Sequence, residues 1–235
     1  MTLARQKIGS HLPFLVASGC ALLPFVAVHW AYVLAADAGH VPWCNPYIDS
    51  CTSISATGRR PPGSFPFKGI MLPSAMLIAV FWWLQAHWLA TVGGQRGQRS
   101  WMLALGWVAS LGLVLYVTVL GEVGDWWRLQ RKIGTILFFS FTFLAQLLFA
   151  AALRRLPREV GPASADYGRR MLRVCMLMLC VGVLSVVIEA LDGDLHDRVE
   201  DAIEWLLALL LQVNFLLCAM LWYRLPWRIA YLKKD

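Results

Sequence analysis

The chain has 235 residues, is 59% hydrophobic and only 15% charged, and carries a formal net charge of +7. Soluble domains contain about 25% charged residues, so this composition excludes an ordinary soluble protein and indicates a membrane protein. The positive charge does not indicate a nucleic-acid partner, because the basic residues lie in short clusters between apolar runs and form no single basic face.

Six apolar runs follow one another along the chain, each close to the roughly 20 residues that a helix needs to cross the hydrocarbon. They lie at about residues 12–35, 69–91, 101–120, 133–153, 170–191 and 202–223. The first follows Arg5 and Lys7, as a signal peptide would, and residues 35–38 offer a weak cleavage site. Its apolar part is longer than the roughly 7–15 residues of a signal h-region, so we expect a retained span. The sequence predicts an all-α fold, a single polytopic membrane domain over residues 1–235 built as a six-helix transmembrane bundle.

The basic residues predict the orientation. If the N-terminus is cytoplasmic, the cytoplasmic segments hold 14 of the 21 Lys and Arg residues with three acids, and the opposite side holds seven basic and eleven acidic residues. This positive-inside bias, with an even number of spans, places the N- and C-termini in the cytoplasm. We expect a multi-pass integral membrane protein of a bacterial inner membrane or of a eukaryotic endomembrane or plasma membrane.

A polar loop with the sequence CNPYIDSCTSISATGRRPPG, residues 44–63, separates the first two spans and falls on the exoplasmic side. Structural disulfides persist on that side, and Cys44 and Cys51 lie outside the predicted spans, so we expect them to pair. The alternatives are two free thiols or a metal pair, although the CxxC spacing and second ligand pair of a metal site are missing. A disulfide favours a folded cap over the exoplasmic mouth of the bundle rather than a solvated loop.

Polar residues at membrane depth are costly and are therefore candidates for function. His29 lies in the outer third of the first span, Ser74 at the matching depth of the second, and Glu189 near the outer end of the fifth. In an acyl hydrolase or transferase, His29 or Glu189 would be the general base, with the Ser74 hydroxyl or a water as nucleophile. The alternatives are an interfacial belt residue beside Trp30 for His29 and a snorkelling side chain for Glu189.

Further candidates for substrate contact share the exoplasmic level and carry hydroxyl, carboxylate or imidazole groups: Ser53, Ser55, Tyr116, Asp125, Glu204 and His196. Glu204 lies within a turn of a helix end, so it too has the snorkelling alternative. The signatures of zinc proteases, serine hydrolases, P-loops and dinucleotide-binding folds are missing from the sequence. We therefore expect no metal and no cofactor, and only the shared depth of these residues indicates a common pocket.

The cytoplasmic segment 153–173 carries six Arg residues. Such a cluster suits a protein partner or anionic lipid headgroups. The alternative to a lipid-processing protein is therefore a non-enzymatic adaptor or scaffold that recruits a partner through this segment. A channel subunit, in which substitutions at Gln212 or Asn214 would block conduction, is a third possibility.

Several short motifs lie between residues 46 and 139, within a resemblance that covers roughly residues 10–225: Pro46-Tyr47-Ile48, Ser53-Ile54-Ser55, Gly58, Pro61-Pro62, Leu72-Pro73-Ser74-Ala75, Leu115-Tyr116-Val117-Thr118, Ile133-Gly134 and Phe138-Phe139. Together they resemble the FRAG, DRAM and SFK family of membrane proteins, which have six spans and cytoplasmic termini. Within it, the first-loop motifs and Leu72-Pro73-Ser74-Ala75 are most similar to the post-GPI-attachment lipid-remodelling branch. Many members carry a His shortly before the fourth span, where this chain has Arg128-Leu129-Gln130-Arg131.

The resemblance implies a ligand class. The lipid-remodelling branch acts on lipid in the lumenal leaflet, whereas other branches are linked to autophagy or to lipid asymmetry and recruitment of a phosphoinositide kinase complex. We therefore expect a protein that binds membrane lipids and processes or distributes them from the exoplasmic leaflet, with GPI-type acyl remodelling as the finer expectation.

Overall fold

The computed structural model describes residues 2–156 and 162–225, and over these residues every regular element is a helix. The helices are α1 (Thr2–Asp37), α2 (Ile54–Thr57), α3 (Ser64–Thr91), α4 (Arg96–Thr118), α5 (Asp125–Arg155), α6 (Pro162–Leu191) and α7 (Gly193–Arg224). All of them except α2 are long and apolar enough to cross a membrane. The predicted all-α fold with six membrane spans is confirmed.

The long helices continue beyond the apolar runs that predicted them. One large difference is at α7, which begins at Gly193 and not near residue 202. Its N-cap is Asp192, whose side chain accepts a hydrogen bond from the Leu195 backbone N–H at 3.0 Å. An Asp cap satisfies one of the free donors in a first helical turn. Hydropathy therefore located the buried part of the helix, whereas the cap determines where it begins.

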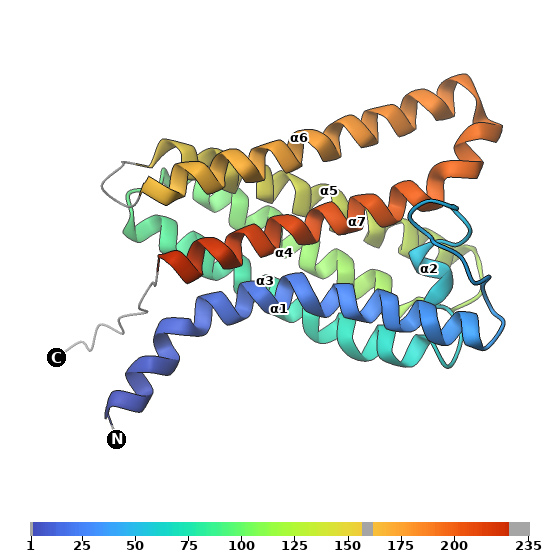
Figure 1. The fold of residues 1–235 in the computed structure, drawn as a ribbon, viewed down its shortest axis with the longest axis horizontal. Helices are drawn as coiled ribbons and strands as arrows, with labels where there is room; N and C mark the ends of the chain where they lie inside the picture. The colour runs from blue at the N-terminus through green and yellow to red at the C-terminus, as the bar shows by residue number, and fades with distance from the viewer. Residues whose placement is uncertain (1, 157–161, 226–235) are drawn as a thin grey trace.

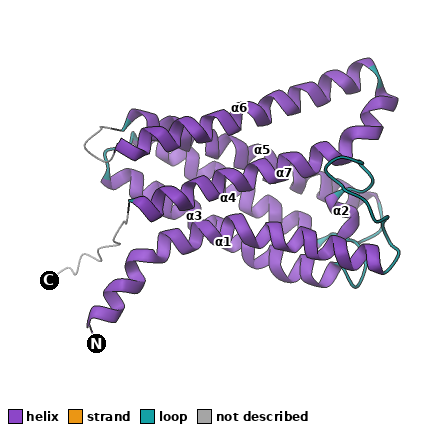
Figure 2. Cartoon of the chain, in the orientation of Figure 1, coloured by secondary structure: helices purple, strands orange, loops and turns teal. Residues whose placement is uncertain are grey.

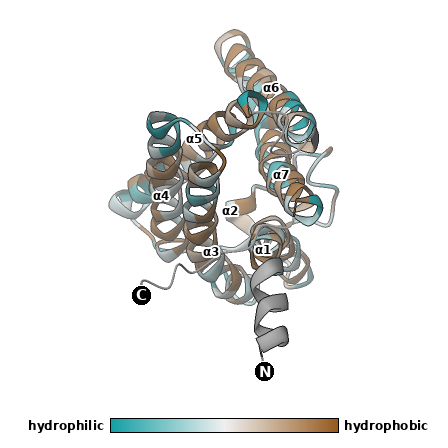
Figure 3. Ribbon diagram, turned by 90° about the vertical axis from the view of Figure 1, so that its left-hand side faces the viewer, coloured by the Kyte–Doolittle hydropathy of each residue, from teal (hydrophilic) through white to brown (hydrophobic). Residues whose placement is uncertain are grey.

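The six long helices form a closed ring. Each packs against two neighbours, in the order α1, α3, α4, α5, α6, α7 and back to α1. Figure 1 shows them running side by side along the molecule, and the view along their axes in Figure 3 places the short α2 in the middle of the ring. In Figure 2 the longest loop, between α1 and α3, lies at the end opposite the start of α1. By the orientation that the charges predict, this is the exoplasmic end.

Polar side chains join α5 to α7 in the cytoplasmic half of the ring. The Gln146 amide donates to the Leu211 carbonyl at 3.0 Å, and the Asn214 amide donates to Gln146 Oε1 at 3.0 Å. Both side chains are buried, where an unmade hydrogen bond would be costly. These bonds hold the two helices together at this depth.

Toward the exoplasmic end the same helices separate. α6 is the most peripheral span. Only 11% of the most apolar stretch of this helix is buried, against 39% or more in the other five spans. Figure 1 shows the α6–α7 hairpin leaning away from the rest of the bundle at that end. The outer half of the ring is therefore less tightly packed between α5 and α7 than the inner half.

Candidate functional site

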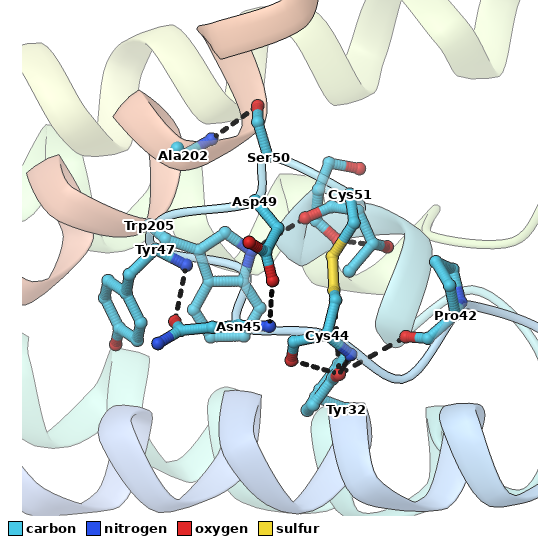
Figure 4. Close-up of a disulfide and its surroundings, with 12 residues drawn as sticks. Tyr32, Pro42, Cys44, Asn45, Tyr47, Asp49, Ser50, Cys51, Ala202 and Trp205 are labelled. Atoms are coloured by element: carbon cyan, nitrogen blue, oxygen red, sulfur yellow. Dashed lines mark hydrogen bonds between the residues drawn. A yellow bond between two sulfur atoms is a disulfide. The ribbon is translucent and has the colours of Figure 1, made fainter.

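The first loop is a folded cap that is fixed to α1. Cys44 and Cys51 form a disulfide, as predicted. The Tyr32 hydroxyl of α1 accepts a hydrogen bond from the Cys44 backbone N–H at 2.8 Å and donates to the Cys44 carbonyl at 2.7 Å. Figure 4 shows Tyr32 beneath the disulfide, with the loop curving around it. One α1 side chain therefore holds the backbone at the base of the disulfide loop.

The other side of the cap is fixed to α7. Trp205 Nε1 donates to the Thr52 carbonyl at 2.9 Å, and the Ala202 backbone N–H donates to the Ser50 hydroxyl at 3.1 Å (Figure 4). Ser53 then caps α2 by accepting from the Ala56 backbone N–H. The cap thus joins the first span to the last and places α2 across the exoplasmic end of the ring.

We expect the disulfide to contribute about 2–3 kcal/mol to the stability of the cap, because it closes a short loop in the unfolded chain. Reduction, or the Cys44→Ser/Cys51→Ser double variant, should lower the melting temperature of the purified protein. Maleimide labelling under denaturing conditions should detect two more thiols after reduction than before. If oxidised and reduced protein melt at the same temperature, the disulfide has no such role.

His29 lies under the cap and both of its ring nitrogens are engaged. Nδ1 is 2.7 Å from the Phe25 carbonyl and Nε2 is 3.1 Å from the Tyr47 hydroxyl. Burial raises the pKa of Tyr47, which keeps the phenol protonated. In the neutral imidazole, Nδ1–H donates to the carbonyl and Nε2 accepts from Tyr47. His29 therefore connects α1 to the cap.

The other residues predicted for catalysis lie elsewhere. Ser74 is fully buried in α3 and donates to the Ile70 carbonyl of its own helix at 2.7 Å. Glu189 is exposed on α6, which packs against α5 and α7. The structure does not gather His29, Ser74 and Glu189 around one cavity, and their catalytic roles stay predictions.

A strongly basic pocket of about 720 Å³ opens beside the cap, between α2, the α4–α5 turn, α5 and α7. Seven Lys and Arg residues belong to the exoplasmic side, all of them in the described part of the chain, and five line this pocket: Arg59, Arg60, Arg128, Arg131 and Lys132. Only two acids, Glu122 and Glu204, are among the lining residues. We name this site the basic pocket.

Two of the arginines are held in place by neutral oxygens. Arg131 donates to the carbonyls of Val119 and Glu122, at 3.3 and 2.7 Å. The Arg59 guanidinium donates to the Ser55 hydroxyl at 3.3 Å. These bonds orient the side chains without neutralising them, so their charge stays available to an anion.

The basic pocket continues into the ring. Tyr116, Thr135 and Glu204 line both the basic pocket and a small inner cavity of about 40 Å³. Every helix except α6 contributes to this inner cavity, whose lining is mostly apolar. The Glu204 carboxyl group lies near the Ile54 backbone N–H at the start of α2. The three shared residues therefore mark the boundary between a cationic entrance and an apolar interior.

The family model of the Frag1/DRAM/Sfk1/Cwh43P N-terminal domain matches residues 13–223. The chain belongs to this family. The match extends over nearly the whole six-span bundle, so the resemblance in the short motifs is confirmed at the level of the family. No curated protein and no solved structure gives a significant match.

In this Frag1-family chain, half of the residues predicted for substrate contact meet at the basic pocket. Tyr116, Glu204 and Ser55 line it. Ser53 lies next to it, with its hydroxyl 3.1 Å from that of Ser55. Asp125 is exposed at the start of α5, 3.6 Å from Arg128 of the pocket.

His196 lies apart from the pocket, where it links α6 to α7. Its Nε2 is 3.2 Å from the Ser185 hydroxyl, and its Nδ1 is 3.9 Å from the Glu200 carboxylate. One of its nitrogens and one carboxylate oxygen each from Asp197 and Glu200 lie within 4.8 Å of one another, close enough for metal ligands. Both acids are exposed, as acidic groups on helix surfaces commonly are, and this grouping does not by itself define a metal site.

The basic residues of the pocket were the functional candidates that sequence reasoning missed. Their signal is an exception to the positive-inside bias, because Arg59-Arg60 and the run from Arg128 to Lys132 lie on the side that should be poor in cations. Two such clusters, one in the first loop and one at the start of α5, indicate a common anionic ligand once the fold brings them together.

The cytoplasmic segment proposed for a partner is partly described. Residues 157–161, including Arg158, lie outside the described residues, and the other five Arg of the segment are exposed. Arg170 and Arg224 lie over the Tyr167 ring, at 5.4 and 5.8 Å from its centre. A partner at this surface stays a prediction.

Proposed function

We propose that this Frag1-family membrane protein binds a phosphate-bearing lipid of the exoplasmic leaflet and processes or distributes such lipids. The observation that carries the proposal is the convergence of five cationic side chains, from the first loop and from the start of α5, on one pocket. Phosphate groups are the anions that arginine forks recognise best, by charge-assisted and bidentate hydrogen bonds. The pocket has more cations than its two acids can balance, which supports an anionic ligand.

The position of the pocket supports a lipid rather than a soluble phosphate. Among the α5 residues that line the basic pocket, Arg128, Lys132 and Thr135 are at helical spacings of four and three residues. Residues at this spacing lie on one face of a helix. The same face continues with Phe139 and Phe143, which are apolar. A ligand that matches this face has a charged head and an apolar tail.

The finer form of the proposal is acyl remodelling of a GPI-type lipid. It rests on the first-loop motifs together with the chemistry at the boundary of the inner cavity. With the phosphate in the basic pocket, the ester groups of a lipid would lie near Tyr116, which carries a hydroxyl, and Glu204, whose carboxylate is a potential base. Among the residues that line the inner cavity, Glu204 carries the one carboxylate. We propose Glu204 as the first residue to replace in a turnover assay.

The binding proposal is tested by mass spectrometry of lipids bound to the purified protein. We expect Arg59→Gln/Arg131→Gln to lower the occupancy of phosphate-bearing lipids at least tenfold, because a hydrogen bond to a charged group contributes about 1.5–3 kcal/mol. Arg198→Gln is the matched control, since Arg198 is an exposed exoplasmic arginine outside the pocket.

The same samples distinguish the ligand and the activity. If glycerol phosphate competes with the bound lipid and binds with the same affinity as the whole lipid, the ligand is a soluble phosphate. A changed acyl composition after incubation with membrane extract, lost in Glu204→Gln, would support remodelling, and a bound lipid without turnover would support distribution. Equal lipid occupancy in the double variant and the Arg198→Gln control would overturn the proposal.

A further inference from the structure

An apolar groove of about 510 Å³ lies between α5, α6 and α7. Its lining is aliphatic and aromatic apart from Ser140 and Gly182, with side chains such as Phe143, Met178 and Val186. On the α6 side it reaches from Met178 to Val187, in the exoplasmic half of that span. The groove is therefore open to the acyl region of the outer leaflet.

The inner cavity adjoins both the groove and the basic pocket, because it shares lining residues with each. Phe139 and Leu211 line both the groove and the inner cavity. Tyr116, Thr135 and Glu204 line both the inner cavity and the basic pocket. The basic pocket, the inner cavity and the groove thus follow one another along a path that begins among cations and ends among apolar side chains.

The length of this path matches one leaflet. On α5 it runs from Lys132 in the basic pocket to Leu144 in the groove. At a helical rise of 1.5 Å per residue these positions are about 18 Å apart along the axis. Half of a hydrocarbon core of about 30 Å is about 15 Å. Near its inner end, the Leu211 carbonyl accepts the Gln146 hydrogen bond that joins α5 to α7.

We propose that the groove holds an acyl chain of the same lipid whose phosphate lies in the basic pocket, so that the ligand is a long-chain lipid that enters sideways from the membrane. This inference rests on the proposed function and specifies its ligand. Gly182 of α6 lines the groove. A Cβ added there would meet no heavy atom within 4 Å, so a larger side chain at this position fills open space and not the packed bundle.

The test uses phosphatidylglycerol with a photoreactive diazirine on the acyl chain, in vesicles that contain the full chain. We expect crosslinks in the α5 and α6 peptides that line the groove. Gly182→Trp should reduce them at least fivefold, whereas binding of glycerol phosphate, which has no chain, should be unchanged. Gly69→Trp is the matched control, because Gly69 is an exposed glycine of α3 with equally open space around it.

Gly182→Leu, with a smaller side chain, should reduce the groove crosslinks by an intermediate amount. This variant keeps the test valid if Gly182→Trp misfolds. Both variants should melt within a few degrees of the wild type. Crosslinks to the groove at the wild-type level in Gly182→Trp would overturn the inference. So would groove crosslinks that persist in Arg59→Gln/Arg131→Gln, because bulk lipid would then fill the groove without a headgroup in the pocket. A third outcome separates the two proposals. If the wild type gives no groove crosslinks, while Arg59→Gln/Arg131→Gln still loses phosphate binding, the inference is overturned and the proposed function stands.

Discussion

Trp205→Ala is expected to destabilise the protein by about 3–5 kcal/mol, the usual cost of removing a buried aromatic side chain. Trp205 is 1% exposed, and its ring lies 5.4 Å from those of His29 and Tyr47 and 6.2 Å from that of Tyr32. Its Nε1–H also donates to the Thr52 carbonyl at 2.9 Å. Truncation would leave a cavity between α1, α7 and the cap, and would leave that carbonyl without its partner.

The measurement is thermal unfolding in detergent, followed with a maleimide dye that reacts with the buried Cys20, Cys175 and Cys218 as they become exposed. Trp205→Phe keeps most of the volume and removes the donor, so it should cost about 1–3 kcal/mol. Trp101→Ala is the control, because Trp101 is 67% exposed, and surface substitutions usually stay within about 0.5 kcal/mol. Equal melting temperatures for Trp205→Ala and Trp101→Ala would show that the cap contributes little to stability.

Gly134→Leu is expected to have the largest effect among substitutions in the spans, because it separates α4 from α5. A Cβ at Gly134 would lie 2.7 Å from the Tyr116 backbone N and 2.8 Å from the Gly112 carbonyl oxygen. Both are backbone atoms, so neither can move unless the helices move apart. Small residues allow membrane helices to approach this closely, since dispersion and not the hydrophobic effect drives their association.

We expect Gly134→Ala to cost about 1–3 kcal/mol by overpacking, and Gly134→Leu to prevent accumulation of the folded protein. Gly134→Ala should also weaken lipid binding more than its stability loss explains, because Tyr116 and Thr135 at the boundary of the inner cavity adjoin this contact. Gly69→Ala, at an open position, should leave the melting temperature and lipid binding unchanged. A Gly134→Leu protein that accumulates and melts like the wild type would show that this close contact is not required.

The six spans and the disulfide could be predicted because their signals are local. Each span is an apolar run of sufficient length, and Cys44 and Cys51 are the cysteines left outside those runs. The docking of the cap could not be predicted, since Trp205 and Thr52 are 153 residues apart and neither carries a motif that names the other. The short α2 was missed, although its N-cap residue, Ser53, was among the candidates for substrate contact.

Membrane depth, read from the sequence, selected some residues that line the basic pocket and others that lie elsewhere, and both results have one cause. Depth gives a residue's level along the membrane normal but not the direction in which its side chain points around the helix. Tyr116 and Glu204 share a level and point toward the same pocket. Ser74 has a comparable depth, but its hydroxyl bonds within α3, and Glu189 points out of the bundle. The packing of the ring decides which direction faces the interior.

The attachment of the cap to both the first and the last span has a consequence for biosynthesis. α1 and the loop leave the ribosome long before Trp205 of α7 is made. At about 5–20 residues per second, the intervening 153 residues take roughly 8–30 s to synthesise. During that interval the disulfide can already form, because both cysteines lie in the loop. The cap has no α7 to dock on until the sixth span is inserted, so the fold is completed in a late step that joins the two ends of the chain.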